Sequence, residues 1–341
     1  MILRKGEINE LVRNRSVEKR LSLAGIKNEG KNHRENHREN ESSCGMMTQG
    51  EEVAGMMAAI KAMNCLAAKG IRPEKVEMSL LLPDGTEEEF LRFVVDEVAL
   101  AGKKADCGVS FQEIQISDAV TRPGAFAYSV GHNHYFDQKR SLDCSKGSSI
   151  FLVGRIGLGG TFLLVHDNQR RKDLSSHFPS YFLQRTDTIK EMLSLIPTLE
   201  AMEIISKEVG IVPQAMISLG DGGLEKALWD LSLVCGCGFE VNLLDVPILQ
   251  ETIELTEYEG INPYALQSTG GLLAVMQDEN HDFVNRLAQL GFFAAQIGKL
   301  TKEKDKVFIV DGKKQYLNRP AADSLLFCCE EDKQKRRRKN E

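Results

Sequence analysis

The residues best suited to chemistry are Asp221, Gly222 and Gly223, which run directly into an apolar segment typical of a helix. Glycine lets another group approach the backbone closely, and the amides at the start of a helix attract anions. The carboxylate of Asp221 suits either a metal ion or the cap of the helix. The stretch therefore predicts one of two structures: a phosphate-binding turn, or a tight turn that only begins a helix.

A second glycine-rich turn spans residues 154–161, after a strand-like apolar segment, and includes Gly157, Gly160 and Thr161. Its spacing only half matches the pattern of dinucleotide-binding turns. An acidic residue at the end of a second strand, about 20 positions further on, is also missing. The turn therefore argues against a nicotinamide site.

Two pairs of histidines have spacings that metal sites use. His33 and His37 are four residues apart in the polar repeat NHRENHREN, and His132 and His134 alternate at the end of a predicted strand. Alternation places the second pair on one face of that strand. A solvated loop explains the first pair better than a metal site does, and a polar turn is the preferred interpretation of the second.

The eight cysteines show no Cys-x-x-Cys spacing of a zinc site. Cys235, Cys237, Cys328 and Cys329 are interpreted as small apolar residues on helices, with metal binding as the less favoured alternative. The sequence has no apolar run of the roughly 18 residues that a membrane span needs, and its first residues do not resemble a signal peptide. We therefore expect a cytoplasmic protein whose cysteines lie in a reducing compartment.

Length and charge narrow the class of protein and partner. The chain has 341 residues, of which 42% are hydrophobic, and a formal net charge of −6 with acidic and basic residues interleaved. A chain of this length can bury a sizeable core and form two domains. The charge pattern argues against a nucleic-acid surface. We expect a small-molecule ligand, a second protein as a possible partner, and neither membrane nor nucleic acid.

Helix-like and strand-like segments alternate through the chain, which predicts an α/β (α+β) fold of two layers. Residues 27–45 contain almost no apolar side chain, so they are expected to be mobile. Thr86 is expected to cap the helix that follows it, and residues 188–210 to form one helix. The expected divisions are an N-terminal helix and mobile loop (1–45), an N-terminal domain (46–146), a C-terminal domain (147–327) and a charged tail (328–341).

The order of these segments resembles the AIR synthase superfamily, from about residue 50 to residue 325. The resemblance rests on the glycine-rich turn and long helix, the Asp-Gly-Gly helix, and the stretches GINPYALQSTGGLLAV, LGFFAAQIGKLT and VDG that follow. It is most specific between residues 221 and 301. Within the superfamily, the sequence is most similar to the hydrogenase-maturation and AIR-synthase-related branch.

The resemblance implies two α/β domains, a homodimer formed through the N-terminal sheets, and ATP with Mg²⁺ bound between the domains. Asn64 matches the asparagine of the family's nucleotide-facing helix. The other implied ATP contacts are the turn with Gly157, Gly160 and Thr161 and the Asp221-Gly222-Gly223 stretch, with Asp221 as the metal ligand. The implied activity is ATP-dependent activation of an amide or carbamoyl oxygen, as in hydrogenase maturation.

Three acidic positions of the family pattern are neutral or absent here. Cys65 replaces the aspartate after Asn64, Ser218 replaces the acid three residues before Asp221, and the NHRENHREN loop replaces a Gly-Asp-Asp-type segment. The chain also continues past Cys329, where a maturation factor would end in its thiolate. The alternative is therefore a catalytically degenerate dimeric paralogue with a binding or regulatory role, in which ATP and Mg²⁺ binding is weak or lost.

Overall fold

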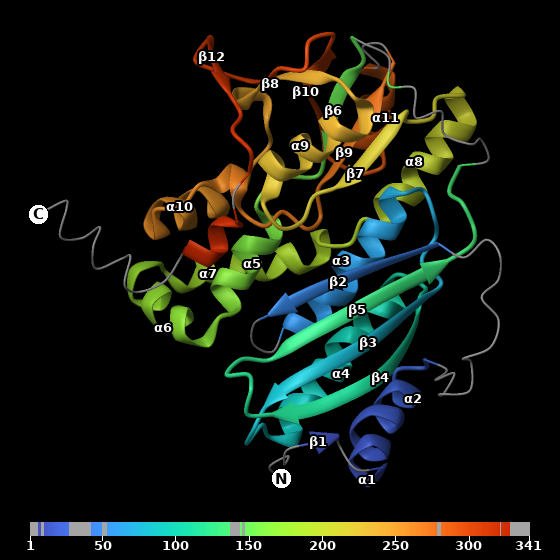
Figure 1. Cartoon of the computed structure of the whole chain (residues 1–341), viewed down its shortest axis with the longest axis vertical. Helices are drawn as coiled ribbons and strands as arrows, with labels where there is room; N and C mark the ends of the chain where they lie inside the picture. Colours follow the sequence, from blue (N-terminus) through green and yellow to red (C-terminus); the bar gives the residue numbers. More distant parts are fainter. Residues whose placement is uncertain are drawn as a thin grey trace, which may run out of the picture. The chain divides into compact units, whose positions relative to one another are not determined.

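Figure 1 shows the computed structural model of the chain, which describes residues 6–7, 10–26, 42–49, 53–136, 144, 147–277, 281–320 and 322–327. The chain divides into two compact units. The first comprises Met1–His134 with His166–Gln169, and the second comprises Tyr135–Val165 with Arg170–Glu341. Both units combine helices with a sheet, which confirms the predicted α/β fold. His33, His37, Cys328, Cys329 and the charged tail lie outside the described residues.

The first unit is built on a five-stranded sheet of order β1-β4-β3-β5-β2. Strands β3 and β4 are parallel, and the other neighbours are antiparallel. Helices α3 and α4 pack on this sheet (Figure 1). The elements are β1 (Gly6–Glu7), α1 (Glu10–Arg13), a π-helical turn (Asn14–Glu18), α2 (Lys19–Leu23), β2 (Ser42–Gln49), α3 (Ala54–Ala68), β3 (Lys75–Pro83), α4 (Glu88–Lys104), β4 (Gly108–Ser117) and β5 (Gly124–Gly131).

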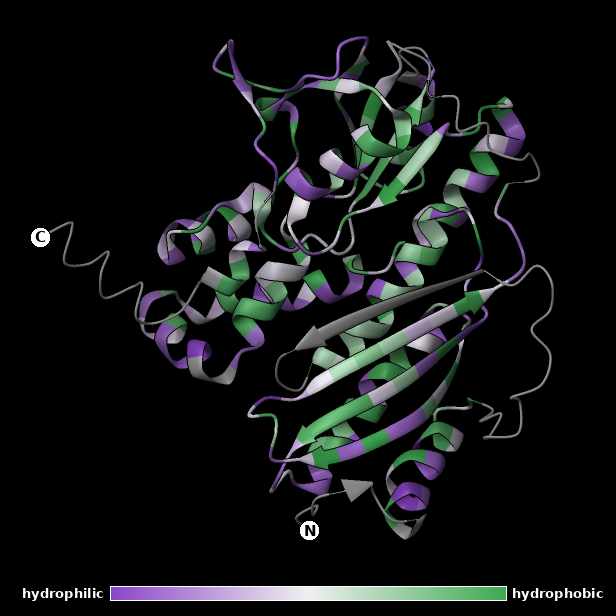
Figure 2. Cartoon of the chain, viewed as in Figure 1, coloured by the Kyte–Doolittle hydropathy of each residue, from purple (hydrophilic) through white to green (hydrophobic). Residues whose placement is uncertain are grey.

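Burial in this sheet follows the pleat. In β3 every second residue is buried and the residues between them are half-buried. In β5, Phe126 and Tyr128 are each 47% exposed, whereas their neighbours Ala125 and Ala127 are buried. The buried face packs on α3, which is mostly apolar (Figure 2) and has Lys61 and Asn64 as its polar residues. The opposite face of β5 therefore presents two aromatic side chains.

Glu88, the first residue of α4, anchors the N-terminal helices to the first unit. Its carboxylate is 4% exposed and accepts hydrogen bonds from Arg15 (2.6 and 2.7 Å), Ser16 Oγ (2.7 Å) and Arg92 (2.7 Å). The pKa of Glu88 is lowered to about 2, and the hydrogen bond from Arg15 is the largest cause. Burial alone would raise this pKa, but the bonds from Arg15, Ser16 and Arg92 together outweigh it. The folded state therefore stabilises the charged form of this buried carboxylate.

The second unit is built on a seven-stranded sheet of order β12-β11-β8-β10-β6-β9-β7. Every residue of β6 and β9 is buried, so both faces of these central strands are covered. Helix α9 packs on β7, and α11 packs on β10 (Figure 1). The strands are β6 (Ser149–Val153), β7 (Ala215–Ser218), β8 (Gly238–Asn242), β9 (Leu272–Met276), β10 (Ala294–Thr301), β11 (Lys306–Val310) and β12 (Lys313–Tyr316). The helices are α5 (Leu158–His166), α6 (Asn168–His177), α7 (Ser180–Asp187), α8 (Ile196–Val209), α9 (Gly223–Cys235), α10 (Gln250–Glu259) and α11 (His281–Gln289).

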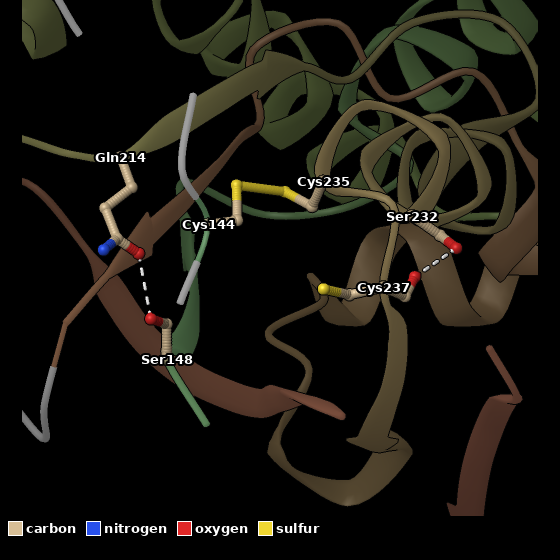
Figure 3. The surroundings of a disulfide bond; sticks show 6 residues. All are labelled: Cys144, Ser148, Gln214, Ser232, Cys235 and Cys237. Carbon is tan, nitrogen blue, oxygen red and sulfur yellow. Dashed lines mark hydrogen bonds between the residues drawn. A yellow bond between two sulfur atoms is a disulfide. The ribbon is translucent and has the colours of Figure 1, made fainter. Parts of the chain in front are cut away.

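A disulfide between Cys144 and Cys235 joins the segment before β6 to the last residue of α9 (Figure 3). Their Cα atoms are 5.4 Å apart, although 91 residues separate them in the sequence. The interpretation of Cys235 as a plain apolar helix residue is therefore wrong, because no local spacing reveals a partner so distant in the sequence. Cys237 is buried and free, as Figure 3 shows, but it follows the helix, and its carbonyl accepts a hydrogen bond from Ser232.

Three other expectations need correction. Residues 42–45 were expected in the mobile loop, but strand β2 begins at Ser42 and pairs with β5. Residues 27–41 lie outside the described residues. Thr86 donates its hydroxyl to the Pro83 carbonyl instead of capping α4, whose N-cap is Glu87. Residues 188–210 form a 3₁₀ turn (Thr188–Met192) and then α8, since the helix restarts ahead of Pro197.

Across the described residues, the structure contains no helix with the length and apolarity needed to cross a membrane.

Candidate functional site

Strand topology brings the two glycine-rich turns of the second unit to one edge of its sheet. Strand β9 is antiparallel to both of its neighbours, and Leu272 at its start pairs with Val153 at the end of β6 and with Ser218 at the end of β7. The turns that follow β6 and β7 must therefore lie beside the segment 264–271, which leads into β9. This sheet edge is the candidate site.

Ser268 ties both turns to that segment. Its hydroxyl accepts a hydrogen bond from the Gly157 amide (2.8 Å) and donates one to the Leu266 carbonyl (2.7 Å). Its own amide donates to the Gly220 carbonyl (3.0 Å). Ser268 is fully buried, so these bonds are shielded from water and fix the position of each turn relative to the other.

In the first turn, the predicted site residues make contacts inside the protein. The amide of Gly160 donates to the Gln267 carbonyl (2.7 Å), and the hydroxyl of buried Thr161 bonds to that of Thr252 (2.8 Å). Gly157 has φ +70°, and a Cβ there would lie 2.5 Å from Thr252 Cγ2. A Cβ on Gly160 would overlap the side chain of Leu266. Glycine is therefore required in this turn by close packing and, at Gly157, by the positive φ as well.

In the second turn, Gly222 is the N-cap of α9 with φ +78°, and Gly223 is its first residue with φ +58°. A Cβ on Gly223 would lie 2.5 Å from the Leu266 carbonyl oxygen and 2.6 Å from that of Tyr264, which only glycine tolerates. Asp221 precedes the cap and is exposed. Because α9 has no side-chain cap bond and Asp221 is not its N-cap, the structure does not support Asp221 as the helix cap.

The start of α9 already holds a carboxylate. Oδ2 of Asp323 accepts a hydrogen bond from the Gly222 amide (2.6 Å), and Oδ1 accepts one from the Leu325 amide (2.8 Å). Burial raises the pKa of Asp323, and the negative charge of Asp221 adds to this, against the opposing effect of the amides of Leu325, Gly222 and Gln267. The amide at the N-cap therefore donates to a carboxylate oxygen in this structure, as it would to a phosphate oxygen in a phosphate-binding turn.

A half-open pocket of about 540 Å³ lies at the same sheet edge. Its lining includes Gly154 and Arg155 from the first turn, Gly270 from the segment before β9, and Phe293 just before β10. The guanidinium of Arg155 lies 4.7 Å from the centre of the Phe293 ring. The pocket thus combines an aromatic wall with a cation, a combination that binds flat or anionic groups.

Asn64 lies in the other unit, so the structure describes it separately from the glycine turns. It is on α3 and is 1% exposed, and Lys61, one helical turn earlier, is 6% exposed. A buried lysine and asparagine three residues apart lie on one helix face. Cys65, which replaces the family's aspartate, is disulfide-bonded and packs against Leu66 and Ile71. It therefore has a structural role here.

His132 and His134 make separate contacts at the end of β5. His132 Nδ1 lies 2.9 Å from Glu74 Oε2, and Asn133 donates its side-chain amide to the same carboxylate (2.8 Å), while exposed His134 pairs with Ile71 in a β-bridge. Burial alone would raise the pKa of Glu74, but the hydrogen bonds from His132 and Asn133 outweigh it and lower the pKa. Within the described residues, no three His, Cys, Asp or Glu side chains gather closely enough to hold a metal ion. These contacts favour the polar turn as the interpretation of this pair.

Two parts of the site were missed by reasoning from sequence. Asp323 lies 101 residues from Gly222, and the apolar segment around it gives no local signal. Ser268 is a small polar residue in a stretch already recognised as family-like, but nothing in its spacing marks it as the link between two turns. Both depend on strand order, which a single sequence does not reveal.

Comparisons with known proteins agree with this architecture. Residues 145–311 match the family model of the AIR synthase related protein, C-terminal domain. The chain is 24% identical over 258 residues to a Methanocaldococcus jannaschii protein named as a hydrogenase expression/formation protein. The aligned region covers 75% of this chain and 72% of that protein. It is also 24% identical over 227 residues to the carbamoyl dehydratase HypE of Rhodobacter capsulatus (66% and 62% covered). The crystal structure of hydrogenase maturation protein HypE in complex with ATP superposes with a TM-score of 0.72, at 16% identity, over 93% of this chain and 96% of that one.

Proposed function

Because this chain belongs to the AIR synthase superfamily and has its two-domain fold, we propose that it binds ATP through the second unit and uses it in a dehydratase-type reaction. The observation that carries the proposal is the anion held by the Gly222 amide at the start of α9. An amide that holds a carboxylate also suits a phosphate oxygen, since both are anionic acceptors. The relative named carbamoyl dehydratase HypE supports this class of reaction.

The proposed roles follow from the contacts. The amide of Gly222 binds a phosphate oxygen, and exposed Asp221 contributes the carboxylate for Mg²⁺. Gly157, Gly160, Thr161 and Gly223 hold the turns in place by close packing. Asn64 of the first unit is assigned to the nucleotide through the family pattern. When bound, ATP would supply a phosphoryl group that turns an amide or carbamoyl oxygen into a leaving group.

The metal requirement is poorly met, which favours a second candidate. Magnesium prefers several hard oxygen ligands, but the family's acidic positions hold Ser218, half-buried in β7, and a disulfide-bonded Cys65. A dimeric paralogue that binds nucleotide weakly and acts by binding or regulation fits these replacements. The two candidates differ in turnover and share the site.

Isothermal titration of ATP with and without Mg²⁺, together with measurement of ADP release, tests the proposal. We expect ATP binding that Mg²⁺ strengthens by less than about threefold, and hydrolysis slower than roughly 1 s⁻¹ would favour the binding paralogue. Faster turnover would favour the enzyme and show that further acids complete the site. Absence of ATP binding at millimolar concentration would contradict both candidates.

A further inference from the structure

We propose that Asp323 is an internal anion that holds the place of a ligand phosphate at the start of α9, and that the short segment carrying it must leave before the ligand binds. The inference rests on the proposed function, because it concerns the same amide. It assigns an autoinhibitory role to residues 322–327, which form the last described segment of the chain.

The Asp323 carboxylate lies among backbone amides that donate hydrogen bonds to it. Each carboxylate oxygen of Asp323 accepts a backbone amide, from Gly222 at 2.6 Å and from Leu325 at 2.8 Å, and the Gln267 amide contributes a further bond. Gly222 and Gln267 belong to the turn and to the segment that build the site, not to the segment that carries Asp323. A ligand phosphate that uses the Gly222 amide therefore has to replace the Asp323 carboxylate.

The segment is held weakly enough to be displaced. It consists of a single 3₁₀ turn, Ser324–Phe327, in which Leu326 is 66% exposed. Such a segment opens locally at low cost compared with unfolding of the unit.

The segment also stays close after it leaves. Leu317 is fixed to β11 by the hydrogen bond from its amide to the Lys306 carbonyl, and only five residues separate Leu317 from Asp323. A tether of this length keeps the released carboxylate at a high effective concentration near the amide. The apparent ligand affinity is then reduced by the fraction of molecules in which the segment is docked.

Titrations of ATP and of inorganic pyrophosphate into the full-length wild-type protein and the Asp323→Asn variant test the inference. The variant keeps the shape of the side chain and removes its charge. We expect both probes to bind Asp323→Asn at least about tenfold more tightly than the wild type. The matched control is Asp311→Asn, an exposed position with φ +49°, which asparagine also tolerates; it should bind like the wild type.

Hydrogen exchange provides the second readout, on the wild type itself. We expect ATP to speed amide exchange in the peptide that covers residues 322–327, since the displaced turn loses its Leu325 and Leu326 hydrogen bonds. If ATP binds both proteins equally and this peptide does not change, the autoinhibitory role is wrong while the proposed function stands. If pyrophosphate alone gains affinity in the variant, the internal anion is right and the nucleotide assignment is wrong. If neither probe binds either protein, both are overturned.

Discussion

The amide of Gly222 donates a hydrogen bond to Oδ2 of Asp323 across 2.6 Å, so the turn predicted to bind phosphate holds a carboxylate of the same chain. This contact supports the proposal that Asp221-Gly222-Gly223 is an anion-binding turn, one of the two structures that the sequence left open. The turn begins α9 without a side-chain cap bond of its own, and the amide at its N-cap donates to a carboxylate oxygen. Both the proposed function and the autoinhibitory role depend on that contact.

Placing an acid at position 218 should restore magnesium dependence. Ser218 ends β7 and is half-buried, three residues before Asp221. A second carboxylate near Asp221 adds a hard oxygen ligand, so Ser218→Asp should strengthen ATP binding in Mg²⁺ by about tenfold, measured by titration with and without the metal. Ser175→Asp, an exposed position on α6, is the control with the same change of charge. An equal gain in both variants, or none in Ser218→Asp, would count against the metal assignment of Asp221.

Replacing Gly223 should damage the site through packing. In Gly223→Ala the new Cβ meets the carbonyl oxygens of Leu266 and Tyr264, so we expect a loss of about 3 kcal/mol in the free energy of unfolding, measured by urea denaturation. Gly236→Ala at the other end of α9 has a similar φ, +63°, but open space around its Cβ, and should cost about 1 kcal/mol. Similar losses in the two variants would mean that close packing at Gly223 is unimportant.

The Glu88 contacts predict a specific acid sensitivity of the first unit. The folded pKa is about 2 against an ordinary value of 4.5, so this carboxylate stabilises the fold above pH 4.5 and the contribution is lost as the pH falls toward 2. Glu88→Gln should lower the free energy of unfolding by about 2 kcal/mol at pH 7 and by little near pH 2. The control is Glu89→Gln, an exposed neighbour that should change stability little at either pH. A loss of stability in Glu88→Gln that is the same at both pH values would refute this account.

The exposed face of β5 is the surface through which we expect the homodimer implied by the family pattern to form. Phe126 and Tyr128 are half-exposed on the face of β5 opposite the face that packs on α3, and such aromatic side chains favour protein contacts. Light scattering should give a dimer for the wild type at micromolar concentration and a monomer for Phe126→Glu. Phe93→Glu, which alters an aromatic residue of similar exposure on α4, should remain a dimer. A monomeric wild type would rule out the dimer.

Local patterns predicted most of the fold, because alternation and helical spacing are recorded in neighbouring residues. Strands β5 and β6 and helices α4 and α9 lie where the sequence placed them. Contacts between distant residues were missed: the Cys144–Cys235 disulfide, the Ser268 link between turns and the Asp323 carboxylate at Gly222. Each contact depends on the strand order β6-β9-β7 or on where the chain runs after β12. The spacing of neighbouring residues predicts neither.

The central claim is that the Gly222 amide is the anion-binding group of the site, and one spectrum tests it directly. Labelling aspartate with ¹³C at the carbonyl and glycine with ¹⁵N selects Asp-Gly pairs, which in this sequence are Asp84-Gly85, Asp221-Gly222 and Asp311-Gly312. The resonance that moves in Asp323→Asn is that of Gly222, since its amide loses the charged acceptor. We predict that ATP shifts this resonance and leaves those of Gly85 and Gly312 in place. An unchanged Gly222 resonance in a protein saturated with ATP would contradict the account.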